Sequence, residues 1–321
     1  MLTLEPLYKK ALNLKALTFE EALFIINTPD NNLVQLLEYA NEIKLKHVGK
    51  KVLLCGIINA RSGKCSEDCS FCAQSTFHST DIKSYPMLSK KEILKSIHTA
   101  KENHAHNFSI VTSGKGMANK KDFETILESI KEIKSIGRCA SLGILSKKQL
   151  VQLKSAGLDK FHHNLETAES FFPNMCTTHT YSDRIKTINN AKEAGLEVCS
   201  GGIFGIGESI PQRVELGIAL RDLKINSVPI NILHPINGTK LYGKVKKMET
   251  PDILKLIATF RFLMPTIILG VIGGREVNMG NNQSKIFTAG ANSIMIGDYL
   301  TTSGNSVESD LRMIKDARLT Y

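Results

Sequence analysis

The sequence predicts an α/β fold, namely a (β/α)8 barrel of the TIM type that follows a short helical segment at the N-terminus. From residue 51 onward, short apolar runs alternate with longer amphipathic stretches. Eight such pairs in about 250 residues match the size of this barrel. Several of the apolar runs also carry polar side chains at every second position, which indicates a barrel interior that holds a ligand. We therefore expect a helical extension over residues 1–48 and one barrel domain over residues 49–321.

The extension is predicted to be helical because it contains a helix start signal. Thr18 and Glu21 have the spacing of a capping box, in which each side chain accepts a hydrogen bond from the backbone of the other residue. Apolar residues such as Ile25 and Ile26 follow at helical spacing. A second helix is expected after the polar residues 30–32.

The barrel strands are predicted from eight apolar runs, each short enough for a strand and bounded by an amphipathic stretch. The predicted strands are residues 52–59, 108–112, 138–143, 161–166, 197–204, 228–233, 267–272 and 293–296. The helices expected between them include residues 90–102, 121–136, 147–155, 183–194, 212–223 and 251–263. No internal repeat, low-complexity tract or linker rich in Pro, Gly or Ser divides this region, so it is predicted to be a single domain.

Strand parity predicts which side chains face the interior, because every second residue of a barrel strand points into the lumen. An ordinary barrel fills these positions with Val, Ile and Leu. Here the inward positions include polar or sulfur-containing residues, namely Cys55, Cys139, Ser141, His162, Asn164, Glu166 and Asn231. Misplaced strands are the alternative explanation, but agreement among several strands favours a lumen that binds a ligand.

The most informative motif lies directly after the first predicted strand, at the end of the barrel where barrel enzymes place their chemistry. Its sequence is Cys65-Ser-Glu-Asp-Cys69-Ser-Phe-Cys72, and no fourth Cys or His follows at the spacing of a zinc finger. A structural zinc site needs four protein ligands. Three thiolates on a [4Fe–4S] cluster instead leave one iron open to a ligand from outside the protein. The alternatives are a zinc knuckle and solvent-exposed thiols in a loop.

Charge and hydropathy exclude several other classes of protein. The formal net charge is +10, but the lysines are spread over predicted helices, aromatic residues make up only 6%, and Trp is absent. These charges are therefore expected on solvated faces, where they attract anionic substrates, and no nucleic-acid partner is predicted. No run of eighteen apolar residues occurs and the N-terminus lacks a signal pattern, so neither a membrane partner nor secretion is expected.

The cysteine count points to the same chemistry as the motif. The chain has seven cysteines, an odd number, which favours metal or redox use over a disulfide framework. An oxygen-labile iron–sulfur cluster also needs a reducing compartment. We therefore expect a cytoplasmic protein.

The cysteine motif, with Phe71 before its last cysteine, is similar to the CxxxCxφC motif of the radical S-adenosylmethionine (SAM) superfamily. Further segments make the chain resemble the biotin synthase family between about residue 50 and residue 305. These segments are Phe161-His-His-Asn164-Leu-Glu166-Thr, Cys199-Ser-Gly-Gly-Ile-Phe-Gly-Ile-Gly-Glu208, Val228-Pro-Ile-Asn231-Ile-Leu, Gly273-Gly-Arg275-Glu276 and Ala289-Gly-Ala-Asn-Ser-Ile-Met-Ile-Gly297. The cysteine motif alone is specific only to the superfamily, whereas the combination is far more specific.

This resemblance implies a radical SAM sulfurtransferase that inserts sulfur into dethiobiotin and forms biotin, the last step of biotin biosynthesis. It implies a [4Fe–4S] cluster on Cys65, Cys69 and Cys72 that binds SAM and cleaves it, so that a 5′-deoxyadenosyl radical abstracts hydrogen from dethiobiotin. By the family match, Asn231 is the catalytic residue between SAM and dethiobiotin, and the SAM contacts are Phe71, Asn164, Glu166 and Arg184. Glu166 suits the ribose hydroxyls and Arg184 the methionyl carboxylate, although Arg184 could instead be a surface charge on a helix.

The resemblance also implies an auxiliary [2Fe–2S] cluster in the barrel, held by three cysteines and one arginine. Cys139 and Cys199 stand at two of the cysteine positions, but the third is Ser109 and the arginine position is Gly270. Serine is a poor replacement, because an alcohol ionises far less readily than a thiol and is a harder ligand. We hypothesise that Cys55 is a ligand instead and that the cluster can be of another type. A small buried hydrophobic residue is the alternative role for Cys55.

Two other functions remain open at this point. Another radical SAM enzyme of the same subgroup, of the maturase or methylornithine-forming kind, would cleave SAM on a different substrate. A non-catalytic iron–sulfur or zinc-binding protein would bind metal without forming deoxyadenosine, but it gives no reason for a polar barrel interior.

His162 stands where many family members have Asn, and Cys176 is predicted to be an incidental thiol. The family further implies a reductase system as electron donor and a homodimer.

Overall fold

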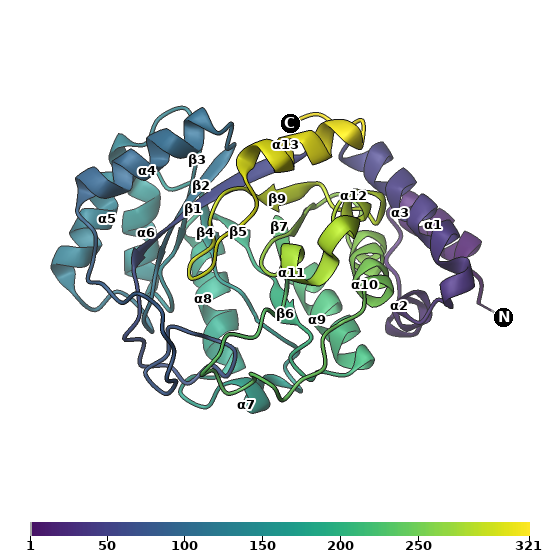
Figure 1. The fold of residues 1–321 in the computed structure, drawn as a ribbon, viewed down its shortest axis with the longest axis horizontal. Helices are drawn as coiled ribbons and strands as arrows, with labels where there is room; N and C mark the ends of the chain where they lie inside the picture. The colour runs from purple at the N-terminus through teal and green to yellow at the C-terminus, as the bar shows by residue number, and fades with distance from the viewer. Residues whose placement is uncertain (1) are drawn as a thin grey trace.

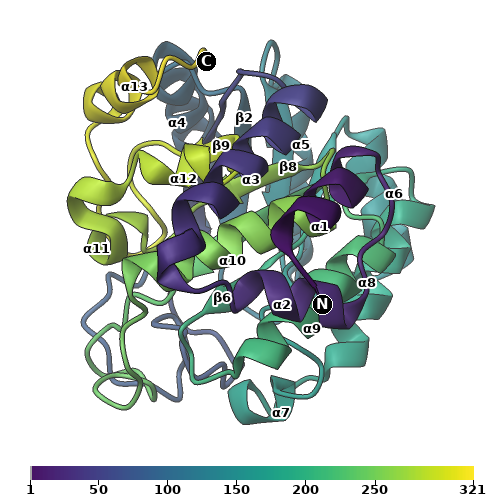
Figure 2. The same ribbon diagram turned by 90° about the vertical axis from the view of Figure 1, so that its right-hand side faces the viewer.

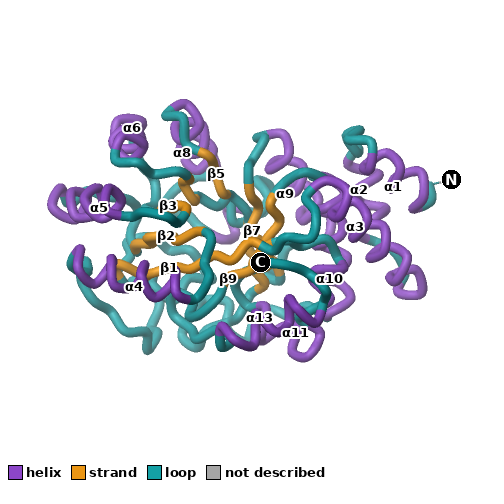
Figure 3. Tube along the Cα trace, turned by 90° about the horizontal axis from the view of Figure 1, so that it is seen from above, coloured by secondary structure: helices purple, strands orange, loops and turns teal. Residues whose placement is uncertain are grey.

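The computed structural model describes residues 2–321 and shows a closed barrel of parallel strands surrounded by helices (Figure 1 and Figure 3). Nine strand segments form one sheet in the order β5-β4-β3-β2-β1-β9-β8-β7-β6, and a further pairing of β5 with β7 closes it. β5 and β6 share one barrel position, so the predicted eight-stranded barrel is confirmed. The segments are β1 (Leu53–Arg61), β2 (Asn107–Thr112), β3 (Gly137–Ser141), β4 (Lys160–His162), β5 (Glu197–Cys199), β6 (Gly202–Phe204), β7 (Ser227–Ile232), β8 (Ile268–Val271) and β9 (Ser293–Met295).

Two strands are interrupted earlier than predicted. The predicted strand 197–204 breaks at Gly201, whose backbone N–H donates to Oδ1 of Asn164 at 3.1 Å instead of to a neighbouring strand. A Cβ atom at Gly201 would lie 1.9 Å from the carbonyl oxygen of Pro229, so no other residue fits there. The predicted strand 161–166 ends at His162, and Glu166 has a φ of 71° in the loop that follows. Both breaks lie close to Asn164 and Glu166, two of the residues predicted to contact SAM.

Helices on the outside of the barrel follow most of the strands. They are α4 (Lys90–Glu102), α5 (Lys120–Glu132), α6 (Lys147–Ser155), α8 (Tyr181–Glu193), α9 (Ile210–Asp222), α10 (Thr250–Leu263), α12 (Lys285–Thr288) and α13 (Val307–Asp316). Shorter pieces are α7 (Phe172–Met175), α11 (Arg275–Met279) and the 3₁₀ turns η1 (Asp30–Asn32) and η2 (Gly280–Asn282). Four of these helices begin with a capping box, which fixes where they start. The N-cap residues are Ser89 for α4, Ser146 for α6, Thr180 for α8 and Ser209 for α9.

The N-terminal segment consists of α1 (Leu4–Leu12), α2 (Phe19–Ile26) and α3 (Leu33–His47), which lie together at one side of the barrel (Figure 2). The predicted capping box is confirmed, since Glu21 N–H donates to Thr18 Oγ1 at 3.2 Å and Thr18 N–H donates to Glu21 Oε2 at 2.8 Å. α2 packs against α9 and α10, and α3 packs against α10. The segment therefore covers part of the outer helix layer, and its boundary at residues 48 and 49 remains a prediction.

The apolar core lies between the strands and the surrounding helices rather than inside the barrel. Phe161, Val198 and Ile230 are completely buried in it. The barrel interior instead contains a cavity of about 440 Å³. Among residues 2–321, no helix is long and apolar enough to span a membrane.

Candidate active site

The cavity in the barrel interior brings together most of the residues singled out from the sequence. Its walls come from all parts of the sheet, and the loop after β1 contributes Phe71 and Cys72. The inward strand parity predicted from the sequence is confirmed for Cys55, Cys139, Ser141, His162 and Asn231, whereas Asn164 and Glu166 reach the cavity from the loop after β4. The predicted site residues that line the cavity are Cys55, Phe71, Cys72, Ser109, Cys139, His162, Asn164, Glu166, Cys199 and Asn231.

Asn164 and Glu166, in the loop after β4, form one hydrogen-bonded group with Arg184 of α8. Nδ2 of Asn164 donates to Oε2 of Glu166 at 3.3 Å, and Nη1 of Arg184 donates to the carbonyl oxygen of Asn164 at 2.9 Å. Arg184 also lies 3.4 Å from Oε1 of Glu166. Only 8% of Arg184 is exposed, so its alternative role as a surface charge is wrong. Its buried Nε has no hydrogen-bond partner within the described chain, and Arg184 is not among the residues that line the cavity.

Asn231 is held in a fixed orientation on β7. Its Nδ2 donates to the carbonyl oxygen of Gly202 at 3.2 Å, and its Oδ1 accepts from the N–H of Gly273 at 3.0 Å. A Cβ atom at Gly273 would lie 3.1 Å from this Oδ1, so a larger residue would disturb the contact. The side chain thus reaches the cavity from a rigid backbone frame.

The remainder of the Gly-Gly-Arg-Glu segment has a structural role. Gly274 has a φ of 73°, and a Cβ atom there would lie 1.9 Å from the carbonyl oxygen of Ile232. Arg275 is completely buried, and its Nη2 donates to both carboxylate oxygens of Asp310 at 2.9 and 3.0 Å. This pair ties the cavity wall after β8 to α13 near the end of the chain.

The cysteine motif occupies a loop whose backbone is fixed by hydrogen bonds. Cys65 N–H donates to the carbonyl oxygen of Gln74 at 3.0 Å, and Cys72 N–H donates to that of Cys69 at 2.9 Å. Burial raises the pKa of Cys72 to about 11, and the neighbouring thiol of Cys65 adds to this shift. A bound metal centre stabilises thiolates, and sulfur is the ligand that iron–sulfur clusters require. The loop therefore fits a cluster held by Cys65, Cys69 and Cys72.

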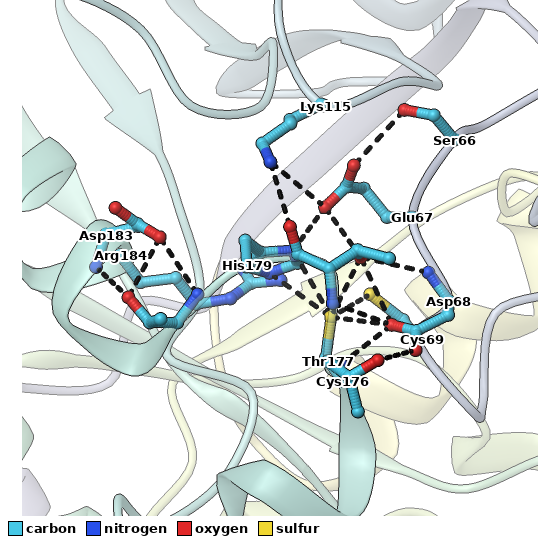
Figure 4. Close-up of polar contacts among 12 residues, drawn as sticks. Ser66, Glu67, Asp68, Cys69, Lys115, Cys176, Thr177, His179, Asp183 and Arg184 are labelled. Carbon is cyan, nitrogen blue, oxygen red and sulfur yellow. Dashed lines mark hydrogen bonds and ion pairs between the residues drawn. The ribbon is translucent and has the colours of Figure 1, made fainter.

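A network of polar side chains lies next to Cys69 (Figure 4). The sulfur atoms of Cys69 and Cys176 are 3.8 Å apart, and Cys176 Sγ donates to Asp68 Oδ1 at 3.1 Å. His179 contacts Glu67 through Nδ1, and the sulfur of Cys176 lies 3.2 Å from the same nitrogen. Cys176 was expected to be an incidental thiol; its sulfur contacts that of Cys69 in the motif, and its lack of a role stays a prediction.

A second group of thiols, those of Cys55, Cys139 and Cys199, lines the cavity. Ser109 pairs with Cys139 in the β2–β3 register, and Cys55 Sγ lies 3.8 Å from Ser293 Oγ. Burial raises the pKa of the thiols of Cys55, Cys139 and Cys199. The hydroxyl groups of Ser109 and Ser227 are buried without a hydrogen-bond partner in the described residues. Soft thiol ligands next to unsatisfied polar atoms fit a bound metal–sulfur group better than a packed core.

Comparisons with known proteins agree with this geometry. The model of the Radical SAM superfamily matches residues 60–216, and that of the Biotin and Thiamin Synthesis associated domain matches residues 229–320. The biotin synthase of Clostridium tetani is 50% identical over 308 residues, which cover 95% of this chain and 94% of the relative. That of Pelotomaculum thermopropionicum is 45% identical over 317 residues, which cover 98% of both chains.

The chain belongs to the biotin synthase family. The predicted family is thereby confirmed, and the alternatives of another radical SAM subgroup and of a non-catalytic metal-binding protein are set aside. Solved structures of methylornithine synthase and of a maturase of the [FeFe]-hydrogenase match with a TM-score of 0.84 at 19% identity. The first match covers 98% of this chain and 96% of the other, and the second covers 97% and 73%. These two structures confirm the radical SAM barrel fold alone.

Three residues of this biotin synthase family member were not singled out as functional from the sequence. Lys160 lines the cavity from β4, although the predicted strand was taken to begin one residue later. Cys176 and His179 reach the cysteine motif from a segment more than a hundred residues away. For Lys160, the inward parity of β4 was a usable signal, since it lies two residues before His162.

Proposed function

We propose that the chain inserts sulfur into dethiobiotin and forms biotin, with SAM as the source of the radical. One observation carries this proposal. A single cavity has a cysteine loop at one end and three further thiols on its walls, with Asn164, Glu166 and Asn231 also lining it. A substrate in this cavity would have access to Cys72 of the cysteine loop and to the three inner thiols.

Cys65, Cys69 and Cys72 would hold the [4Fe–4S] cluster. When it is bound and reduced, this cluster supplies the electron that cleaves SAM. The chain contributes a loop that presents Cys72 and Phe71 to the cavity. The apolar ring of Phe71 excludes water from that wall, which matters because a primary carbon radical attacks whatever lies nearest.

Asn164, Glu166 and Arg184 would bind SAM. A carboxylate such as that of Glu166 accepts hydrogen bonds from two ribose hydroxyls, and a guanidinium such as that of Arg184 suits a carboxylate. The hydrogen bonds among the three side chains support this role, because they hold the binding groups in place before SAM arrives.

Asn231 would be the catalytic residue that contacts both SAM and dethiobiotin. The amide is already oriented by Gly202 and Gly273, so it pays little entropy when it binds a ligand. His162 lines the same cavity, and burial lowers its pKa, so it meets the substrate as a neutral imidazole. A neutral ring both donates and accepts a hydrogen bond, which suits the ureido group of dethiobiotin.

Cys55, Cys139 and Cys199 would hold the auxiliary iron–sulfur cluster, whose bound sulfide supplies the sulfur atom. Ser109 lies beside Cys139 and would remain a neutral hydroxyl. Gly270 lines the cavity too, so no side chain comes from the position of the family arginine. The three thiols leave the cluster type open between [2Fe–2S] and a larger cluster.

The remaining assignments concern partners and location. We propose a reductase system as the electron donor, a homodimer as the assembly and the reducing cytoplasm as the compartment. We also propose that residues 1–48 form a helical extension, separate from the catalytic barrel of residues 49–321.

The proposal is tested anaerobically. The protein is reconstituted with iron and sulfide, mixed with reductant, SAM and dethiobiotin, and assayed by mass spectrometry for 5′-deoxyadenosine and biotin. We expect both products from the unaltered chain and neither from a Cys72→Ala variant. Deoxyadenosine without biotin from fully loaded protein would reject sulfur insertion into dethiobiotin, and the absence of both would reject the radical reaction.

A further inference from the structure

Lys160 is a buried cation in the barrel interior. It begins β4, it is 8% exposed, and it lines the cavity. Its ion-pair partner within residues 2–321 is Glu197, at 3.4 Å. The side chain of Glu197 is 59% exposed, so water screens its charge and the pair contributes little. The positive charge of Lys160 is therefore only weakly balanced in the chain by itself.

The surroundings of Lys160 on the cavity side are the three thiols. Cys139 is its partner in the β3–β4 register, and Cys199 pairs with His162 in the β4–β5 register, on the same parity as Lys160. Burial raises the pKa of Cys55, Cys139 and Cys199, and the charge of Lys160 acts on all three in the opposite direction. Lys160 thus lies within electrostatic reach of each thiol.

The charge of a metal–sulfur group at these thiols complements that of Lys160. Three thiolates on an oxidised two-iron, two-sulfide cluster leave one net negative charge, and so do three thiolates on a four-iron, four-sulfide cluster in its usual oxidised state. Burying an unbalanced charge of either sign is costly, and burying the two together offsets part of that cost through their mutual attraction. One lysine therefore balances the site for either cluster type.

We propose that Lys160 is the fixed countercharge of the metal–sulfur group bound by Cys55, Cys139 and Cys199. It is a positioning residue that retains the anionic group in the barrel and raises its reduction potential, since a nearby cation favours the added electron. This inference rests on the proposed auxiliary cluster. It does not depend on which substrate receives the sulfur.

The test isolates this group from the cluster of the cysteine motif. In a Cys65→Ala/Cys69→Ala/Cys72→Ala/Cys176→Ala background, only the inner thiols of Cys55, Cys139 and Cys199 remain to bind a cluster. Lys160→Met removes the charge and keeps a long side chain, Lys160→Arg keeps the charge, and Glu197→Gln removes only the exposed partner. Each variant is reconstituted anaerobically, and three quantities are measured: iron and acid-labile sulfide per chain, the rate of iron loss to a chelator, and the midpoint potential by titration followed with electron paramagnetic resonance.

We expect Lys160→Met to lose iron at least fivefold faster and to have a midpoint potential lower by about 59 mV, which is a tenfold shift of a one-electron couple. In Lys160→Arg, the rate of iron loss should stay within about twofold of that of the background protein. The midpoint potential should stay within the shift that corresponds to a twofold change of a one-electron couple. Glu197→Gln should leave iron retention unchanged. A structural role alone would not move the potential.

Two results would overturn the inference in distinguishable ways. An unchanged potential and unchanged iron retention in a folded Lys160→Met protein would reject the countercharge and leave the cluster site intact. No iron in the background protein with Lys160 present would reject the inner cluster and the countercharge with it. Biotin formation by the unaltered chain is measured separately and decides the proposed function.

Discussion

Replacement of Asp310 by Asn is expected to destabilise the folded protein. Asp310 is 1% exposed, and its carboxylate accepts two hydrogen bonds from the completely buried Arg275. In the Asn variant, the neutral amide presents an N–H group to a guanidinium that can only donate. Among residues 2–321, the buried positive charge of Arg275 then keeps only Glu276, at 3.0 Å, as an anionic partner.

The magnitude follows from the burial of the pair. Breaking a buried ion pair on one side costs about 3–5 kcal/mol, because the remaining charge is left without its partner. Glu276 still compensates part of the charge, so the lower end of about 3 kcal/mol applies. That loss corresponds to a change of about a hundredfold in the unfolding equilibrium constant.

The assay is urea unfolding of the cluster-free protein, followed by circular dichroism, for the unaltered chain, Asp310→Asn and a matched control. Glu308→Gln is the control, because Glu308 pairs with Arg312 on the same helix, α13, but both side chains are at least 70% exposed. We expect a loss of less than about 1 kcal/mol for the control. Equal midpoints for Asp310→Asn and Glu308→Gln would refute the assignment of Arg275 and Asp310 as the anchor of α13.

Three further outcomes follow from the site. Cys55→Ala should lower the iron and sulfide content of the reconstituted protein, whereas Ser109→Ala should leave both unchanged; equal metal content in all three proteins would remove Cys55 from the ligand set. Arg184→Met should weaken SAM binding at least tenfold, measured by equilibrium dialysis, since a charge-assisted hydrogen bond contributes about 1.5–3 kcal/mol, and iron content should not change. An unaltered dissociation constant would contradict the SAM contact. Burial lowers the pKa of Lys44 to about 8, so the unfolded chain binds more protons than the folded one between that pH and the ordinary pKa of lysine, and this group makes stability rise with pH in that window. From pH 8 to pH 10, the unfolding free energy of the unaltered chain should therefore rise relative to that of Lys44→Met, and a constant difference would rule out this linkage.

The parts of the fold that depend on local periodicity could be predicted from the sequence. The alternation of apolar and amphipathic runs was sufficient for the barrel, and the spacing of Thr18 and Glu21 was sufficient for the first capping box. Inward parity was sufficient to place His162 and Asn231 in one cavity, because a strand period of two leaves only two faces.

The remaining features depend on contacts between distant parts of the chain. The break at Gly201 follows from the close approach of Pro229 and from the side chain of Asn164, neither of which has a local signature. Likewise, Cys176 contacts Cys69 only because the segment after α7 folds back onto the cysteine loop. Arg184 is buried by the same tertiary packing, although helical surface spacing left its exposure open.

The central claim is that one cavity joins SAM cleavage at the cysteine loop to sulfur donation from the inner thiols. It is tested most directly by reconstituting the protein with ³⁴S-sulfide, removing free sulfide, and following a single turnover with SAM and dethiobiotin by mass spectrometry. We predict ³⁴S-labelled biotin from the unaltered chain, and deoxyadenosine without labelled biotin from a Cys139→Ala variant. Unlabelled biotin from the unaltered chain, or labelled biotin in equal amount from Cys139→Ala, would contradict the claim.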